Sequence, residues 1–412
     1  MSLLKLKQEV VSGGTQSAVV PEKAEPSTMV IGTLAWVALF AFLGWTNPWM
    51  LVFVLGLAVS IMLHELGHFW TARRSGMKAT QFFLGFGSRV WSIHRNGVEY
   101  GVRAIPLGGF VKIIGMTNVD EVAPEDEGQT YRQGTYARRM WVITAGSVMH
   151  LIIAFAIIVP VYAFAGRVQD TNDVHLARIV ADSPAAKAGL LPGDLVVSID
   201  GEAMRDADRM RDILAATAPG ASLTIVILRD GITMTTQPVL QQNPSVTDKV
   251  QGFLGVSPTT EDRVAVGLFD ALVQGPKDLF VGVGQAVQGV AKVLNPVSVY
   301  GHLVGTNKDA SSRPGTIVGA TQMSSDVGKF DGWAGILSLL AAVNVSVGVF
   351  NMFPLLPLDG GHAAIATYER IRSRRNRRYF ADVNKLMPVA AVCLALIAFM
   401  FLTGLYLDTI KN

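Results

Sequence analysis

Five long apolar runs, separated by polar segments, constrain this chain more than any other feature. Of its 412 residues, 50% are hydrophobic and 16% are charged, whereas soluble chains carry about 25% charged residues. Apolar runs of this length are typical of helices that cross a membrane. The sequence therefore predicts an α-helical polytopic membrane protein with about five transmembrane helices. We place them at Met29–Trp45, Trp49–Trp70, Met140–Ala165, Trp333–Leu358 and Leu386–Leu407.

The second run ends in the motif His64-Glu65-Leu66-Gly67-His68. Residues four apart lie on one face of a helix, so His64 and His68 can present their imidazoles to one metal ion. Glu65 lies on the adjoining face, where a carboxylate can take a proton from a metal-bound water. Ionisable residues inside an apolar span are costly and usually functional. We therefore favour a metal centre over a chance match.

Other ligand candidates are few. Cys393 is the single cysteine, which excludes a cysteine zinc site and an internal disulfide, so zinc ligands must be histidine and carboxylate. His150, in the third run, is a candidate ligand, but we favour a packed or hydrogen-bonded role. Asp359 follows Pro354 and Pro357, which break the fourth run, and broken helices are tolerated in a membrane only where they are buried or line a cavity. The alternative role for Asp359 is a helix cap.

The basic residues predict the orientation of the chain. The polar tail 1–28, which we interpret as flexible rather than as a secretory signal, should be cytoplasmic. So should the loop 71–139 and the segment Glu369–Arg378, which has six arginines in ten residues. Five spans then bring His64, His68 and Asp359 to one depth near the cytoplasmic face. The predicted divisions after the tail are 29–165 and 333–412 in the membrane, with 166–260 and 261–332 between them outside the cytoplasm.

The dipeptide Asn96-Gly97 lies between strand-like segments Ser88–Arg95 and Val98–Ile105, and it predicts a β-hairpin. The surrounding loop is too apolar for a solvated one. We therefore favour a membrane-associated hairpin beside the metal over an ordinary surface hairpin. The residues expected to enter the membrane there are Phe82, Phe83, Phe86 and the stretch Pro106–Phe110.

Residues 166–260 are soluble in composition, and Ser183–Asp194, followed by Leu195–Gly201, resembles the PDZ signature of bacterial envelope proteases. In a PDZ domain, a peptide adds as a strand to a sheet edge, and backbone amides of a glycine-containing loop hold its terminal carboxylate. Gly252–Val256 resembles that loop, displaced to the end of the domain as in circularly permuted PDZ domains. The resemblance implies one extracytoplasmic PDZ domain that binds peptide through Phe253, Leu254 and Gly255. The alternative, left open, is that the domain only blocks access to the metal.

The segment 261–332 is predicted to be an extracytoplasmic amphipathic linker. Within it, Val264–Val293 predicts one or two helices on the membrane surface, and Gly301–Lys329 predicts a polar loop.

The His64–His68 motif, the stretch Asn351–Gly360 and the PDZ-like segment between them together resemble the site-2 protease family of intramembrane zinc metalloproteases, of the bacterial regulator-of-sigma-factor type. That resemblance implies Zn²⁺ held by His64, His68 and Asp359, with Glu65 as general base and Asn351 on the substrate backbone. It implies that the hairpin receives an unwound substrate as an added strand. The implied substrates are membrane-anchored proteins such as anti-sigma factors or remnant signal peptides.

Two departures and two alternatives accompany this resemblance. Family members often have Gly-Pro and Asn in the third span, where this chain has Gly146-Ser147 and His150, and the run Met29–Trp45 precedes the usual four-span core. A transporter or channel with broken helices explains the prolines but not the metal motif. An idle PDZ scaffold has no need of Glu65. The expected location is the plasma membrane, with the lipid bilayer as a partner and no nucleic acid.

Overall fold

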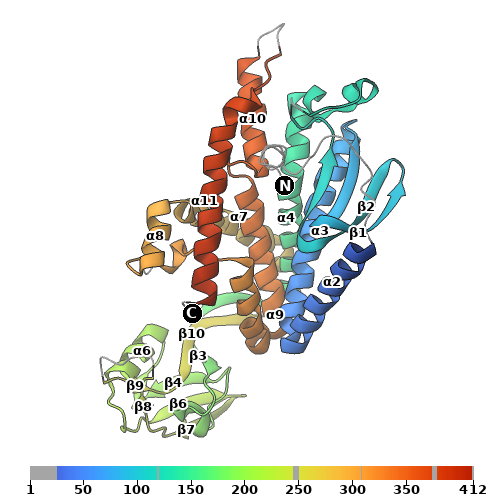
Figure 1. Cartoon of the computed structure of the whole chain (residues 1–412). Helices are drawn as coiled ribbons and strands as arrows, with labels where there is room; N and C mark the ends of the chain where they lie inside the picture. The colour runs from blue at the N-terminus through green and yellow to red at the C-terminus, as the bar shows by residue number, and fades with distance from the viewer. Residues whose placement is uncertain (1–25, 118–119, 245–249, 308, 374–377, 411–412) are drawn as a thin grey trace. The chain divides into compact units, whose positions relative to one another are not determined.

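The computed structural model describes residues 26–117, 120–244, 250–307, 309–373 and 378–410. It divides into two compact units (Figure 1): unit 1 contains Met1–Ile158 and Val273–Asn412, and unit 2 contains Val159–Leu272. Most of the predicted tail, residues 1–25, lies outside the described residues. So do residues 374–377 of the arginine-rich segment.

Within the described residues, five helices are long and apolar enough to cross a membrane, as predicted. The second one begins where the sequence places a turn. There the Asn47 side chain accepts a hydrogen bond of 2.8 Å from the Trp49 N–H, and Pro48 occupies the first turn, where a missing N–H costs nothing. The five helices are α2 (Pro26–Thr46), α3 (Pro48–Arg74), α4 (Tyr136–Ala165), α9 (Ile317–Asn351) and α11 (Val383–Thr409).

The start of α9 differs from the prediction. The helix begins at Ile317, so the prediction of a polar loop through Lys329 is wrong for its second half. Thr316 caps this helix by accepting a hydrogen bond from the Gly319 N–H. Gly332 then interrupts the helix with φ 59° and ψ −146°, a conformation that only glycine adopts readily. The predicted start of the span, Trp333, is therefore the start of the second half of α9.

The end of α9 also differs from the prediction. The helix ends at Asn351 rather than Leu358, because Pro354 and Pro357 follow and have no N–H to donate. The chain turns and begins α10 (Asp359–Arg372). A Cβ added at Gly360 would lie closer than 3.0 Å to the carbonyl oxygens of two residues in the turn, so this close approach requires glycine. The turn places Asp359 in the first turn of α10, where the helix dipole favours a carboxylate.

Unit 1 also contains the predicted hairpin, which is longer than expected. Strands β1 (Ala79–Arg95) and β2 (Val98–Ile113) pair antiparallel on either side of Asn96-Gly97, both with positive φ. Residues 81–84 have partners on both sides, at 109–112 and at 99–102. Residues 109–113 therefore form one edge of this small sheet.

The first apolar helix packs on this sheet (Figure 1). The Trp36 Nε1–H of α2 donates a hydrogen bond of 2.9 Å to the Arg103 carbonyl oxygen of β2. A Cβ added at Gly32 would lie closer than 3.0 Å to the Val90 side chain, so glycine allows helix and sheet to touch. The helix is thus a structural neighbour of the hairpin.

The helix predicted in Val264–Val293 is present as α7 (Leu268–Val293). The next helix, α8 (Pro296–Val304), extends into the predicted polar loop, and a 3₁₀ turn η3 (Ala310–Ser312) follows. One face of α7, with Leu279, Val283 and Ala286, packs against buried residues of α4 and α9. Its location on a membrane surface stays a prediction.

Unit 2 is built on one sheet with the strand order β10-β3-β4-β6-β7, in which β5 also pairs with β4. The amphipathic helix α6 buries Met210 and Leu214 against a core that includes Val174, Ile225 and Leu254. The elements are β3 (Arg167–Ile179), α5 (Pro184–Lys187), β4 (Leu195–Ile199), β5 (Glu202–Ala203), α6 (Ala207–Ala216), β6 (Ile225–Arg229), β7 (Ile232–Thr236), β8 (Gln241–Gln242), β9 (Gly252–Phe253) and β10 (Val256–Val264).

Candidate metal centre

The structure brings His64, His68 and Asp359 together, each with one ligand atom within 4.8 Å of the others. The two Nε2 atoms are 3.1 Å apart, and Oδ2 of Asp359 lies 3.5 Å from His64 Nε2 and 3.3 Å from His68 Nε2. Ligand atoms about 2.1 Å from a tetrahedral zinc ion are separated by roughly 3.4 Å. All three separations are close to that value. Oδ2 of Asp359 is buried and, among the described residues, has no hydrogen-bond partner, so these residues fit a zinc ion.

His68 is oriented by the neighbouring helix α4. Its Nδ1 lies 2.7 Å from the Val142 carbonyl oxygen. Because a carbonyl oxygen only accepts, Nδ1 carries the proton and donates it, and Nε2 keeps its lone pair on the side of His64 and Asp359. Metal-binding histidines usually have such a hydrogen bond on the second ring nitrogen.

Two glycines bring α3 and α4 into contact at the centre. A Cβ added at Gly146 would lie closer than 3.0 Å to the imidazoles of His64 and His68. A Cβ added at Gly67 would be 2.8 Å from the Ala145 carbonyl oxygen. The third span therefore contributes a close backbone wall beside both histidines. Small residues such as Ala145-Gly146-Ser147 suit close helix packing, but the sequence does not identify the partner helix.

Glu65 lies next to the edge of the β1–β2 sheet. A Cβ added at Gly109 would be 3.2 Å from Cγ of Glu65 and 3.2 Å from the Phe83 carbonyl oxygen. Phe83 is fully buried, and its ring stacks on Phe110 with the centroids 5.5 Å apart. The part of the predicted element that lies beside Glu65 is thus the 109–113 end of β2. The side chains of residues 106 and 107 lie outside the described part, and insertion of this element into the membrane stays a prediction.

His150 is a buried, hydrogen-bonded residue, the role that we favoured from the sequence. The Asn344 Nδ2 donates to the Leu340 carbonyl oxygen (2.8 Å) and to Ser60 Oγ (3.1 Å), which leaves its Oδ1 to accept from His150 Nδ1 at 2.8 Å. The His150 ring lies 4.9 Å from that of His64. Among the described residues, it is not part of the three-residue group.

Asn351 is the last residue of α9 and is half-buried. Between it and Asp359 the chain forms a turn rather than a helix. Its contact with a substrate backbone stays a prediction.

The predicted peptide-binding loop lies in unit 2. The Leu254 side chain is buried in the core, Phe253 is half-buried in β9, and Gly255 has a φ of 81°. The Leu254 carbonyl accepts from the Ala185 N–H at 2.9 Å, and the Gly255 carbonyl accepts from the Val180 N–H at 2.8 Å. Because its side chain is buried and its carbonyl oxygen is already bonded, Leu254 can offer a ligand only its backbone N–H group.

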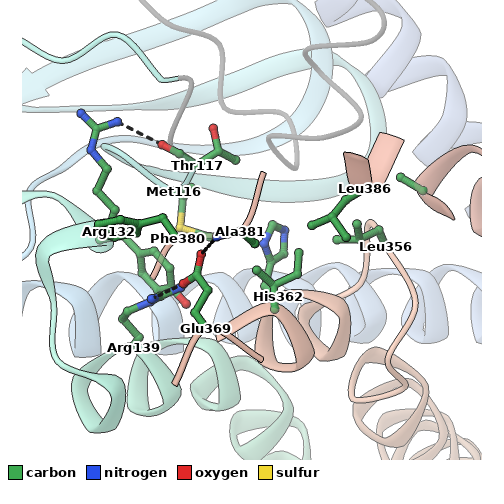
Figure 2. A pocket seen from close by; sticks show the side chains of 13 residues that line it. Met116, Thr117, Arg132, Arg139, Leu356, His362, Glu369, Phe380, Ala381 and Leu386 are labelled. Atoms are coloured by element: carbon green, nitrogen blue, oxygen red, sulfur yellow. Dashed lines mark hydrogen bonds and ion pairs between the residues drawn. The ribbon is translucent and has the colours of Figure 1, made fainter. Parts of the chain in front are cut away.

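A hollow lies beside the metal centre, at the next turn of α10 (Figure 2). His362 projects into it, and burial lowers the pKa of this imidazole. Arg139 of α4 and Glu369 of α10 form a buried ion pair of 2.6 Å at its side, and Glu369 also accepts from the Ala381 N–H at 2.8 Å. The lining residues are Met116, Thr117, Tyr131, Arg132, Arg139, Leu356, His362, Ile365, Glu369, Phe380, Ala381, Leu386 and Ala390.

One wall of this hollow is held by a second ion pair, between the short helices η1 (Pro124–Gln129) and η2 (Tyr131–Gln133). The Arg132 guanidinium donates two hydrogen bonds to Glu127, of 2.5 and 2.9 Å, and these bonds lower the pKa of the Glu127 carboxyl to about 2. Arg132 also donates to the Thr117 carbonyl oxygen, which ties the hollow to this loop.

Comparison with known proteins matches residues 52–398 to "Peptidase family M50". The "Zinc metalloprotease Rip1" of Mycobacterium tuberculosis (strain ATCC 25618 / H37Rv) is 33% identical over 393 residues, which cover 86% of this chain and 95% of that protein. The "Putative zinc metalloprotease R01501" of Rhizobium meliloti (strain 1021) is 29% identical over 336 residues, 78% of this chain and 87% of that protein. Among solved structures, the PDZ domain of the SdrC-like protein from Listeria monocytogenes is 22% identical to this chain, with a TM-score of 0.19, and the match covers 21% of this chain and 88% of that one.

Proposed function

The chain belongs to peptidase family M50, and on that premise we propose that it hydrolyses peptide bonds in or near the transmembrane segments of membrane-anchored proteins. It is a zinc metalloendopeptidase of the site-2 protease type. In the proposal, His64, His68 and Asp359 hold the zinc ion and Glu65 is the general base. The observation that supports this most directly is the 3.1 to 3.5 Å spacing of the three ligand atoms.

Zinc, when bound, supplies a Lewis acid for the scissile carbonyl and lowers the pKa of a bound water to about 7. Glu65 takes the proton of the attacking water and passes it to the leaving amine. The Val142 carbonyl keeps the His68 ring in the tautomer that leaves Nε2 free for the metal. The Gly146 backbone lies against both imidazoles and leaves no room for a side chain on that side.

The edge of β2 at residues 109–113 is the proposed place for an unwound substrate strand. A peptide bond inside a membrane helix is shielded by the hydrogen bonds of the helix, so the substrate must unwind before hydrolysis. A sheet edge can pair with the backbone groups that unwinding frees. This edge passes next to Glu65, so a strand added to it would bring a peptide bond to the general base. Asn351 is proposed to contact the backbone of the same substrate strand.

The active site is proposed to lie near the cytoplasmic face. Arg73 and Arg74 occupy the last turn of α3, just beyond the motif, and Arg370 and Arg372 occupy the last turn of α10. Basic residues at the ends of membrane helices favour the cytoplasmic side. This orientation gives water a short path to the metal, and it places residues 166–260 outside the cytoplasm.

Residues 166–260 are proposed to form a PDZ domain that binds the carboxyl terminus of a peptide at Phe253, Leu254 and Gly255. Among the described residues, the N–H groups of Leu254 and Gly255 donate to no backbone carbonyl, so both remain for a carboxylate. The proposed substrate class remains membrane-anchored proteins such as anti-sigma factors or remnant signal peptides.

The decisive test exchanges Glu65 for glutamine. Glu65→Gln should retain zinc, because it keeps all three ligands, and should abolish cleavage of a single-span substrate in purified protein. An exposed carboxylate of the same type, changed in Glu125→Gln, should leave both zinc and cleavage unaltered. Mass spectrometry of membrane peptides that accumulate with Glu65→Gln would identify natural substrates. Cleavage by the clean variant would remove Glu65 from the proposed role.

The ligand set has a separate test. Asp359→Ala should lose zinc, measured by elemental analysis of the purified protein. Unchanged zinc content would place the third ligand elsewhere and would leave the role of Glu65 untouched.

A further inference from the structure

The strand β10 forms one edge of the sheet of unit 2. It pairs with β3 on one side, and the helix α6 lies against it. The proposed peptide-binding loop, residues 253–255, leads directly into this strand. An edge next to a helix is the place where a peptide can add as a further strand.

The register shows which backbone groups face outward from this edge. The Pro258 carbonyl oxygen accepts a hydrogen bond of 2.7 Å from Arg211 of α6, so it points away from β3. The register with β3 is irregular between Ser257 and Pro258. Backbone groups of a strand alternate in direction, so Val256, two residues before Pro258, presents its groups to the same free edge. On the other side, the Gly255 carbonyl oxygen accepts from the Val180 N–H of the segment that follows β3.

Pro258 closes the edge in two ways. An added strand needs both an N–H donor and a C=O acceptor from every second residue of its neighbour. Proline has no N–H, and its carbonyl oxygen is already bonded to the Arg211 guanidinium. Arg211 is also paired with Asp208 one turn before it on α6.

From these contacts we propose that unit 2 recognises only the last two residues of a peptide with a free carboxyl terminus. Arg211 then acts as a latch, by which we mean that it keeps further peptide residues from pairing with β10. This rests on the proposed peptide capture by the 253–255 loop. The loop amides hold the carboxylate, and the Val256 carbonyl accepts from the N–H of the terminal residue. The third residue from the end would meet Pro258, which has no N–H to donate and whose carbonyl oxygen already accepts from the Arg211 guanidinium. A short terminus left by an earlier cleavage fits this site better than an extended segment.

The test measures fluorescence anisotropy with the full chain in detergent micelles. The probes are dye-labelled Ala-Val and Ala-Ala-Ala-Val with free carboxylates, and the longer peptide as its carboxyl amide. For the native chain, both acids should bind equally and the amide more weakly. Arg211→Ala should tighten binding of the four-residue acid alone by about two- to tenfold, the range for one recovered hydrogen bond. Arg211→Ala combined with Pro258→Ala, which restores an N–H, should tighten it further.

Arg209→Ala is the matched control. It removes the same charge from the same helix, but Arg209 pairs with Glu202 rather than with β10. It should leave both affinities unchanged. Binding of the longer acid that exceeds that of the shorter one in the native chain, or an Arg211→Ala variant without length dependence, would overturn the latch. Equal binding of acid and amide, or no saturable binding by any variant, would overturn the peptide capture itself and the latch with it.

Discussion

The glycine beside both imidazoles gives the sharpest quantitative prediction. In Gly146→Ala, the new methyl would lie closer than 3.0 Å to both His64 and His68, whereas ordinary contact begins at 3.4 Å. Relief therefore requires a displacement of more than 0.4 Å, the difference between these values. Metal-ligand distances tolerate only about 0.2 Å. We expect zinc affinity to fall by at least the ~10- to 100-fold seen when a metal site loses support, or ~1.4 to 2.8 kcal/mol.

The assay is competition for zinc with a chelator of known affinity, backed by elemental analysis of the purified protein. Gly284→Ala is the control, because this α7 glycine would gain a methyl that meets nothing within 4 Å. Without steric conflict, glycine to alanine inside a helix stabilises by up to about 1 kcal/mol. The control should keep its zinc and unfold no earlier than the native chain. Native zinc affinity in Gly146→Ala would refute the argument that α4 forms the wall of the centre.

Three further predictions concern the surroundings of the centre. Glu369→Ala should lower the thermal unfolding midpoint, because the buried Arg139 charge is left without its partner at a cost of about 3–5 kcal/mol. The Glu127 carboxyl, with its pKa lowered to about 2, stabilises the fold above its unfolded pKa near 4.5. That stability should be lost as pH falls from about 5 towards 2, and Glu127→Gln should flatten this part of the profile of unfolding midpoint against pH. Gly109→Val should slow peptide hydrolysis with zinc content unchanged, because its side chain would occupy the space beside the general base; undiminished turnover would argue against that edge.

The features that sequence alone predicted depend on short-range rules. His64 and His68 are neighbours because one helical turn separates them. Asn96-Gly97 forms the hairpin turn because both residues adopt positive φ. For Asp359, the parity of the spans predicted only a common depth with the histidines, and its role as a ligand came from the family resemblance.

What the sequence did not predict depends on packing between distant segments. The start of α9 was missed because Ile317–Lys329 is polar enough to resemble a loop, although its helix buries Thr321 and Ser324. The Arg139–Glu369 pair joins residues 230 apart, and neither end carries a local signature. The contact of Gly146 with the histidines likewise depends on where two helices cross.

The N-terminal helix α2 has a consequence for how this enzyme can be re-engineered. Through Trp36 and Gly32, it holds the outer side of the hairpin whose other end borders Glu65. A chimaera in which a foreign anchor replaces residues 26–46 would still be delivered to the bilayer, but with the Arg103 carbonyl deprived of its indole donor. Such a chimaera would separate the two tasks of this segment, membrane tethering and bracing of the sheet.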